Sequence, residues 1–275
     1  MMIAETEEKV KRLTGAMAGY PRKVAVAFSG GVDSAFLLSV ASEILGDDLF
    51  AVTVNAGFVP RRDIDHAGSV AEALCVSHEM IYVDFNRIDN FTDNPTDRCY
   101  YCKRAIFSGL KEFAAKRGAE TVIEATNADD LEDYRPGIRA LSELDVKSPL
   151  IEARFSKNEI RKLSKERGVP GWDRPSDACL ATRIETGQQV TATKLEQIEE
   201  AENYLKSLGF ALCRVRHHGA LARIEVSPDK IDDILSSSVR QGIDKRFREL
   251  GFIYVTVDME GYKRGSMNKE LNHRK

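Results

Sequence analysis

The sequence lacks any apolar run that approaches the length of a membrane-spanning helix, and no secretory apolar segment follows its acidic start at residues 5–8. It also lacks the basic excess of many nucleic-acid-binding proteins, because its formal net charge is −3, so only a local basic patch would offer such a surface. Internal repeats and low-complexity tracts are missing as well. These absences predict a cytoplasmic globular protein whose 275 residues form one large or two smaller domains.

Cysteine is scarce, and its number is odd. In a cytoplasmic protein this indicates metal binding, catalysis or burial rather than disulfides. Cys75 lies among apolar residues of a predicted helix, and Cys213 alternates with apolar residues in a predicted strand, so we interpret both as buried without a chemical role. The three others are Cys99, Cys102 and Cys179.

Apolar strands alternate with amphipathic helices over residues 5–168, which is typical of an α/β doubly wound parallel sheet. Strands are predicted at residues 24–28, 49–54, 79–83 and 121–125, and helices at 5–18, from 34 to about 45, 61–74, 105–116 and 157–168. Polar residues predict loops at 89–98 and 127–137.

The pattern changes near residue 187. Helices are predicted at 191–208, 228–235 and 239–250, strands at 211–216, 222–226 and 253–257, and a turn at 217–219. We therefore predict two domains: residues 1–187, and a small α+β domain at 188–275 whose polar end is frayed.

The most informative motif is SGGVDS at 29–34, between a predicted strand and a predicted helix. This order directs backbone N–H groups and a positive helix end at one point, which predicts an anion site. Gly30 and Gly31 permit close approach, and Ser29 and Ser34 add hydroxyl donors. The loop has no Lys, so it is not a Walker loop. Asp33 either coordinates Mg²⁺ beside a phosphate or stabilises the helix start.

A second polar run follows the predicted strand at 121–125, and ligands of open α/β sheets bind at such strand ends. Thr126 and Asn127 are candidates to bind a nucleotide, and Asp129 to hold Mg²⁺. The alternative is a polar turn with an Asp helix cap. Arg135 adds a cation in the same loop.

The third motif is Cys99-Tyr-Tyr-Cys102, a spacing used in zinc and iron–sulfur sites, with Cys179 further along the chain. Three cysteines would leave one iron of a cubane without a protein ligand, whereas a fourth ligand from His217 or His218 would make a closed zinc site. In the small domain, Arg214 and Arg216 share one face of a strand. They suit a phosphate or carboxylates, or else form a solvated face.

The loop motif resembles the pyrophosphate loop of the ATP pyrophosphatase (PP-loop) superfamily, whose members split ATP into AMP and pyrophosphate. The whole chain resembles the LarE family of sulfur-inserting enzymes of nickel-pincer nucleotide biosynthesis. The matching segments are AFSGGVDSAFLL at 27–38, CYYCK at 99–103, EATNADDLEDYRPG at 124–137, SPL at 148–150, GVPGWDRPSDACLATRI at 168–184 and GFALCRVRHHGALARIEV at 209–226.

This resemblance implies ATP- and Mg²⁺-dependent adenylation of pyridinium-3,5-biscarboxylic acid mononucleotide, followed by sulfur insertion. It implies a [4Fe–4S] cluster on Cys99, Cys102 and Cys179 that carries the transferred sulfide, with Arg183, Arg214 and Arg216 facing the substrate. Some members instead sacrifice their own cysteine sulfur. The resemblance also implies a homo-oligomer, with a trimer-based hexamer as the family precedent, and neither a nucleic-acid nor a membrane partner. It leaves the sulfur donor open.

Three other classes fit part of the pattern. A PP-loop tRNA thiolase also uses cysteines and a cluster, but it needs an RNA-binding surface that the charge of −3 does not favour. An amide-forming PP-loop synthetase would leave the three cysteines without a purpose. A non-catalytic nucleotide sensor would release no pyrophosphate.

Overall fold

The computed structural model describes residues 2–21, 23–131, 136–175 and 178–263. The chain divides into two compact units. The first comprises Met1–Phe91 and Asp97–Asp177, and the second comprises Thr92–Thr96 and Ala178–Lys275. A short segment from the middle of the sequence thus belongs to the second unit.

The first unit is built on a parallel sheet with strand order β3-β2-β1-β4. Its strands are β1 (Val24–Ala27), β2 (Leu49–Asn55), β3 (Ser77–Tyr82) and β4 (Thr121–Ile123). Val24 pairs with Leu49 on one side and with Thr121 on the other, so β1 is central. The predicted parallel α/β sheet is confirmed.

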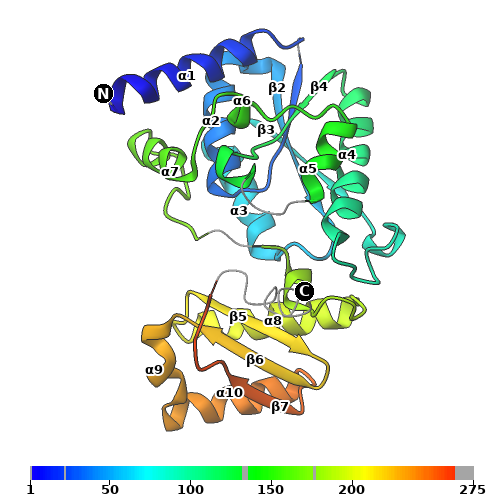
Figure 1. Ribbon diagram of the computed structural model, residues 1–275, viewed down its shortest axis with the longest axis vertical. Coiled ribbons are helices and arrows are strands. Elements are labelled where there is room, and N and C mark those ends of the chain that lie inside the picture. The colour runs from blue at the N-terminus through cyan, green and yellow to red at the C-terminus, as the bar shows by residue number, and fades with distance from the viewer. Residues whose placement is uncertain (1, 22, 132–135, 176–177, 264–275) are drawn as a thin grey trace. The chain divides into compact units, whose positions relative to one another are not determined.

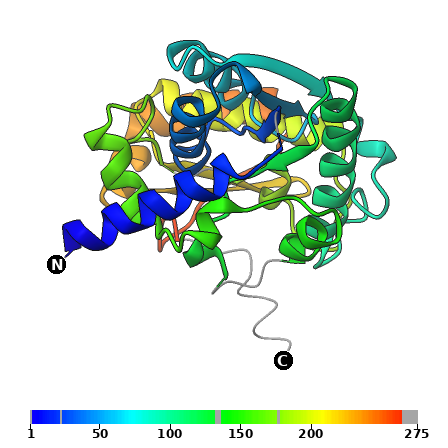
Figure 2. The same cartoon turned by 90° about the horizontal axis from the view of Figure 1, so that it is seen from above.

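Helices cover both faces of this sheet, as Figures 1 and 2 show. The helices are α1 (Met2–Ala18), α2 (Val32–Leu45), α3 (Arg61–Ala73), α4 (Arg98–Lys116), α5 (Pro136–Glu143), α6 (Pro149–Glu152) and α7 (Lys157–Glu166). Alternate residues of β1 enter different cores. Val24 and Val26 pack with α1, α2, α3 and α7, whereas Ala25 packs with α4 and α5. This two-faced burial explains why the strands are apolar throughout.

In the first unit, α4 begins earlier than predicted, and the sequence analysis predicted neither α5 nor α6. Helix α4 begins at Arg98 rather than at residue 105, so the CxxC motif lies on a helix. Its N-cap is Asp97, which makes no capping side-chain bond and lies in the segment predicted as a loop. The short helix α6 begins with Pro149, whose fixed backbone angle suits a first helical position. Short 3-10 turns are η1 (Gly46–Asp48), η2 (Phe85–Arg87) and η3 (Ala128–Leu131).

The second unit has a three-stranded sheet of order β5-β6-β7. Its elements are η4 (Leu180–Arg183), α8 (Ala192–Ser207), β5 (Cys213–His218), β6 (Leu221–Val226), η5 (Pro228–Lys230), α9 (Ile231–Leu235), α10 (Ser237–Glu249) and β7 (Tyr254–Val257). Strands β5 and β6 form an antiparallel hairpin, and β7 is parallel to β6. Helices α8 and α10 close a separate apolar core around Val215, Ile224 and Phe247. Among the described helices, none has the length and apolar character that crossing a membrane requires.

Candidate active site

The glycine turn after β1 has the conformation that an anion site requires. Gly30 has a φ of +72°, and a Cβ there would lie 2.9 Å from the Cα of Ala67. Both features require glycine. Gly31 is the N-cap of α2 and makes no side-chain capping bond, so the first N–H groups of this helix are available to a ligand.

The two hydroxyls of the loop are connected. Ser34 Oγ donates to the carbonyl of Gly31 at 2.9 Å and lies 3.1 Å from Ser29 Oγ. The sequence placed both serines in one loop, and the structure brings their oxygens into direct contact. Because Ser34 gives its hydrogen to Gly31, Ser29 supplies the hydrogen of the contact between the two hydroxyls, and together they hold the turn closed.

The structure brings Asp33 together with the second motif. Asn127 Nδ2 donates to Asp33 Oδ2 at 2.9 Å, although the two residues are far apart in sequence. Burial, and next the charge of Asp130, raise the pKa of Asp33 above its usual value. Asn127 is fully buried, and its Oδ1 has no hydrogen-bond partner among the described residues. A buried oxygen of this kind beside a carboxylate fits a cation or a hydrogen-bond donor of a nucleotide.

Asp129 and Asp130 both contact the start of α7. Asp129 Oδ2 accepts a hydrogen bond from the backbone N–H of Lys157 at 2.9 Å. The ammonium of Lys157 lies 2.7 Å from Asp130 Oδ1, and Asp130 is buried. Neither Asp130 nor Lys157 was predicted as a site residue; the sequence marks only the helix start at Ser156, and the fold brings Lys157 to Asp130.

Glu124 holds the segment after β4 in place through its hydrogen bonds. Its carboxylate accepts hydrogen bonds from the N–H and hydroxyl of Thr126 at 3.0 and 2.5 Å, and from Ser148 Oγ at 2.5 Å. The hydroxyl hydrogen of Thr126, a predicted nucleotide contact, is thus directed to Glu124. Arg135 lies outside the described residues.

A further polar chain supports the strand that leads into the glycine turn, and sequence reasoning missed it. Thr53 Oγ1 donates to the carbonyl of Phe28 at 2.8 Å. His78 Nε2 lies 2.8 Å from the same hydroxyl, which has already given its hydrogen, so His78 must be the donor. This chain fixes the carbonyl directly before Ser29.

The predicted cysteine set is divided between the two units. Cys99 and Cys102 are the second and fifth residues of α4, and their separation of three residues puts both on one face of the helix. Cys179 belongs to the second unit as the N-cap of η4. Within the described ranges, no group of three or more His, Cys, Asp or Glu side chains gathers as a metal site. The three-cysteine site stays a prediction.

Predictions were also made for Cys75, Cys213 and His217, and only the one for Cys213 is confirmed. Cys75 is exposed rather than buried, with a φ of +53° at the end of α3. Cys213 is buried, as predicted. His217 lies within β5 rather than in a turn. It contacts Gln197 Oε1 through Nε2 at 3.1 Å, and burial lowers its pKa to about 4.

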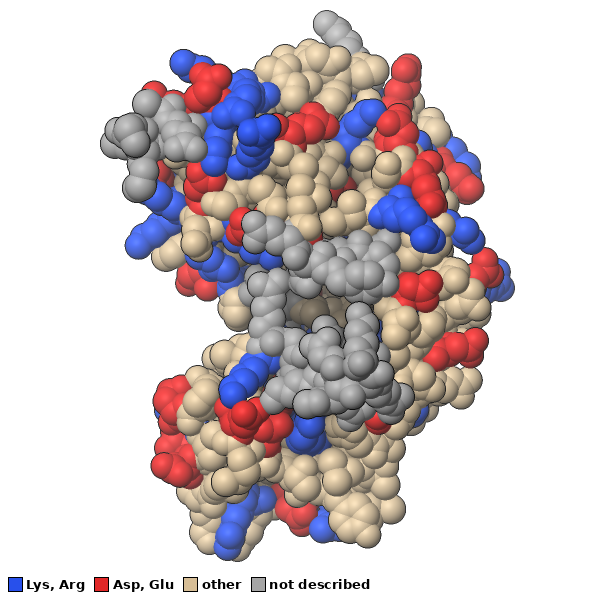
Figure 3. All heavy atoms as spheres, viewed as in Figure 1, with Lys and Arg blue, Asp and Glu red and all other residues tan. Residues whose placement is uncertain are grey.

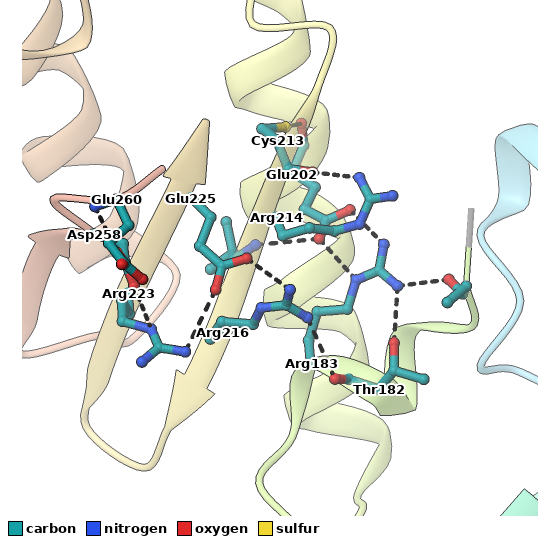
Figure 4. A network of polar contacts seen from close by, with 12 residues as sticks. Thr182, Arg183, Glu202, Cys213, Arg214, Arg216, Arg223, Glu225, Asp258 and Glu260 are labelled. Carbon is teal, nitrogen blue, oxygen red and sulfur yellow. Dashed lines mark hydrogen bonds and ion pairs between the residues drawn. The ribbon is translucent and has the colours of Figure 1, made fainter. Parts of the chain in front are cut away.

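The second unit contains a buried network of arginines and glutamates (Figure 4). Arg214 and Arg216 are buried on one face of β5, so a solvated strand face is wrong. Arg216 Nη2 donates to Glu225 Oε2 at 2.6 Å, and the guanidinium of Arg214 lies 5.0 Å from the centre of the Tyr262 ring. Arg183 is fully buried and pairs with Glu202 at 2.9 Å. Burial alone would raise the pKa of Glu202, but the paired charge of Arg183 outweighs it, and this pKa is lowered.

A parallel sheet whose central strand passes through a lysine-free glycine turn into a helix defines an ATP-using PP-loop domain. The family model for asparagine synthase matches residues 17–99, which contain this turn. A protein of Thermoplasma volcanium that forms part of its glutamine-hydrolysing GMP synthase is 31% identical to the chain over 192 residues, which are 63% of this chain and 60% of that protein.

Several relatives match nearly the whole chain. The pyridinium-3,5-bisthiocarboxylic acid mononucleotide synthase of Lactiplantibacillus plantarum is 37% identical over 251 residues, which are 91% of this chain and 90% of that protein. The uncharacterised protein slr1717 of Synechocystis is 38% identical over 246 residues, 90% of this chain and 92% of its own length. The chain belongs to the family of the pyridinium-3,5-bisthiocarboxylic acid mononucleotide synthase, the LarE family.

Proposed function

We propose that this protein adenylates a carboxylate of pyridinium-3,5-biscarboxylic acid mononucleotide with ATP and then replaces the activated oxygen by sulfur. The observation that carries the adenylation step is the open start of α2 beside Asp33 and Asn127. The substrate class comes from the 37% identical relative, whose name states a bisthiocarboxylic acid mononucleotide as its product.

In the first step, a carboxylate oxygen of the substrate attacks the α-phosphorus of ATP, and pyrophosphate leaves with the electron pair. The N–H groups of α2 and the hydroxyls of Ser29 and Ser34 bind the departing pyrophosphate. Asp33 and Asp129 are our proposed holders of Mg²⁺, which would neutralise phosphate charge when bound. The buried Oδ1 of Asn127 is oriented by the same Asp33 contact.

In the second step, a sulfur nucleophile attacks the carbonyl carbon of the acyl-adenylate, and AMP leaves with the former carboxylate oxygen. We propose Cys99, Cys102 and Cys179 as the ligands of a [4Fe–4S] cluster; when bound, it would supply a soft sulfide nucleophile. Cys99 and Cys102 suit such a site, because their separation of three residues puts both on one face of α4.

Substrate binding needs cations, because the substrate carries a phosphate and two carboxylates. Arg214 and Arg216 are our candidates, since both come from one face of β5 and both are buried, where charge-assisted bonds are strong. Assembly as a homo-oligomer stays a prediction.

The adenylation step is tested by substrate-dependent pyrophosphate release. Ser34→Ala removes the hydroxyl that joins Gly31 to Ser29, and release should fall by about a hundredfold. Ser42→Ala, which removes a hydroxyl of the same helix bonded only to its preceding turn at Ser39, is the matched control and should behave as wild type. Release at the wild-type rate from Ser34→Ala would remove the loop from the mechanism.

The sulfur step is tested by single Ala variants of the three cysteines in protein purified without oxygen. A cluster site predicts that each variant loses iron and sulfur insertion together, while pyrophosphate release continues. A sacrificial mechanism predicts instead that only Cys179→Ala is inactive and that the wild-type chain becomes about 34 Da lighter after turnover, as cysteine becomes dehydroalanine. One zinc and no iron would make the site structural.

A further inference from the structure

Arg183 is the largest fully buried side chain of the second unit, and Figure 4 shows it between Thr182 and Glu202. Its Nη1 donates to the carbonyl of Ala178 at 2.6 Å and to the carbonyl of Cys179 at 3.1 Å. Its Nε and Nη2 donate to the two carboxylate oxygens of Glu202 at 2.9 and 3.2 Å. One guanidinium therefore joins the backbone of the cysteine segment to helix α8.

The carbonyl of Cys179 is held from three directions. Besides Arg183, it accepts hydrogen bonds from the backbone N–H of Thr182 at 3.0 Å and from Thr182 Oγ1 at 2.8 Å. The backbone of Cys179 is extended, with φ of −60° and ψ of 150°, and its side chain is partly exposed. A fixed carbonyl and fixed backbone angles determine the direction of the Cα–Cβ bond. The partly exposed thiol of Cys179 is therefore attached to a backbone that is held in place.

Glu202 connects Arg183 to strand β5, which carries Arg214 and Arg216. Its Oε1 also accepts a hydrogen bond from the backbone N–H of Val215 at 3.2 Å. Val215 lies between Arg214 and Arg216 on β5. The path from the Cys179 carbonyl through Arg183 and Glu202 therefore ends on the strand that carries the proposed substrate-binding arginines.

We propose that Arg183 is a positioning residue that holds Cys179 in register with Arg214 and Arg216, and that it does not bind substrate itself. The proposal rests on the proposed function in taking Cys179 as a sulfur-handling residue. Arg183 has the required shape, because only a planar fork reaches a carboxylate with one edge and backbone carbonyls with the other. A lysine has the same charge but a single donor centre, so it fails to make both sets of bonds.

The test must separate this role from that of an ordinary buried ion pair. Arg183→Leu combined with Glu202→Leu removes both charges of this pair, so neither partner is left as an unpaired buried charge. Arg183→Lys keeps the charge and removes the fork. Lys9→Met, which breaks the Lys9–Glu159 pair of the first unit, is the matched control, because it also removes a cation from an ion pair between helices.

The first readout is the rate of iodoacetamide alkylation of Cys179 in protein as purified, measured by peptide mass spectrometry relative to the exposed Cys75. Loss of the Arg183 hydrogen bonds to the Cys179 segment should raise this ratio by about tenfold in Arg183→Lys and in the double variant. The ratio should stay unchanged in Lys9→Met. The second readout is turnover: kcat for thiocarboxylate formation should fall by about a hundredfold, because misplacement by an ångström has that effect, while the KM for ATP stays constant.

The double variant decides the question. If Arg183 and Glu202 only neutralise one another, the double variant keeps wild-type alkylation and turnover, and the proposal is overturned. Failure of the proposed function is distinguishable: wild-type protein would then form no thiocarboxylate, yet the alkylation ratio would still report whether Arg183 fixes Cys179. An alkylation ratio unchanged in both Arg183 variants would overturn the positioning role in either case.

Discussion

At the scale of single residues, the sequence predicted most of the candidate site residues but not the residues that they contact. The glycine turn is recognisable because Gly30 and Gly31 stand between an apolar strand and a helix. The contact between Asp33 and Asn127 follows only from the adjacency of β1 and β4 in the sheet, which the sequence does not state. Arg183 illustrates the limit: its charge was visible, while its complete burial depends on the packing of η4 against α8.

Asp33 should show opposite effects on stability and activity. Its pKa is raised in the folded chain, so its stabilising contribution exists at acid pH and is lost as the pH rises through the raised pKa. At neutral pH the ionised group therefore lowers the stability of nucleotide-free protein. Asp33→Asn should raise the unfolding temperature without nucleotide, and pyrophosphate release should fall by about a hundredfold or more.

The check is thermal unfolding with and without Mg²⁺ and ATP. Wild type should gain more from the ligands than Asp33→Asn, because stabilisation by a ligand grows with the logarithm of its concentration relative to Kd. Asp47→Asn, which removes an exposed carboxylate from η1, is a control for charge alone. A variant that is less stable without nucleotide and equally protected by it would contradict the role assigned to Asp33.

His217 should make the protein sensitive to acid. Its pKa is lowered to about 4 by burial, so the folded chain holds the neutral ring, and stability falls as the pH drops from about 6.5 towards 4. His217→Gln keeps a group beside Gln197 but does not titrate. Its urea midpoint should fall less than that of wild type between pH 7 and pH 5. Part of the acid loss should remain, since burial also lowers the pKa of His66 and His78.

At the scale of elements, the sequence was most informative where local signals exist. Helix α7 was predicted to begin at residue 157, and the structure confirms it because Ser156 and Glu159 form a capping box there. Helix α4 was predicted to begin too late, because its N-cap Asp97 lies in a segment that was predicted as a loop. The strands were found because burial on both faces makes them apolar, whereas α5 was missed in a segment whose polar residues resemble a loop.

Asp129 contacts the first residue of α7, and it has two candidate roles: to stabilise this helix start and to bind Mg²⁺. Asn at this position still accepts the hydrogen bond from the N–H of Lys157 but has no charge for Mg²⁺. Asp129→Asn should therefore unfold like wild type while needing more Mg²⁺ for half-maximal pyrophosphate release. Asp129→Ala should in addition lose about 1 kcal/mol of the free energy of unfolding. An unchanged Mg²⁺ requirement in Asp129→Asn would assign this carboxylate to α7 alone.

At the scale of the whole molecule, the sequence indicated two α/β parts, and the contacts divide the chain between residues 177 and 178. Residues 92–96 join the second unit through long-range bonds. The N–H of Gly187 donates to the Asn94 carbonyl at 2.8 Å, and the N–H of Val190 donates to that of Thr92 at 2.8 Å. A loop that leaves one unit to bind another carries no periodic signal, so sequence reasoning could not assign it. The predicted boundary at 187 stays a prediction about which segments fold together.

The distribution of charge over the molecule leads to a test of the substrate class. The formal net charge is −3, and on the face shown in Figure 3 basic and acidic side chains are interspersed. A protein that neutralises many RNA phosphates loses about 10³–10⁵ in affinity between about 50 and 200 mM salt. A mononucleotide bound by a few buried guanidiniums releases few counterions, so kcat/KM for pyrophosphate release should fall by less than about tenfold over that range. Bulk tRNA should neither replace the mononucleotide nor compete with it. Stimulation by tRNA that disappears steeply with salt, with thiolated nucleosides in the product, would identify a tRNA thiolase instead, because only a polyanion held along its backbone gives both results.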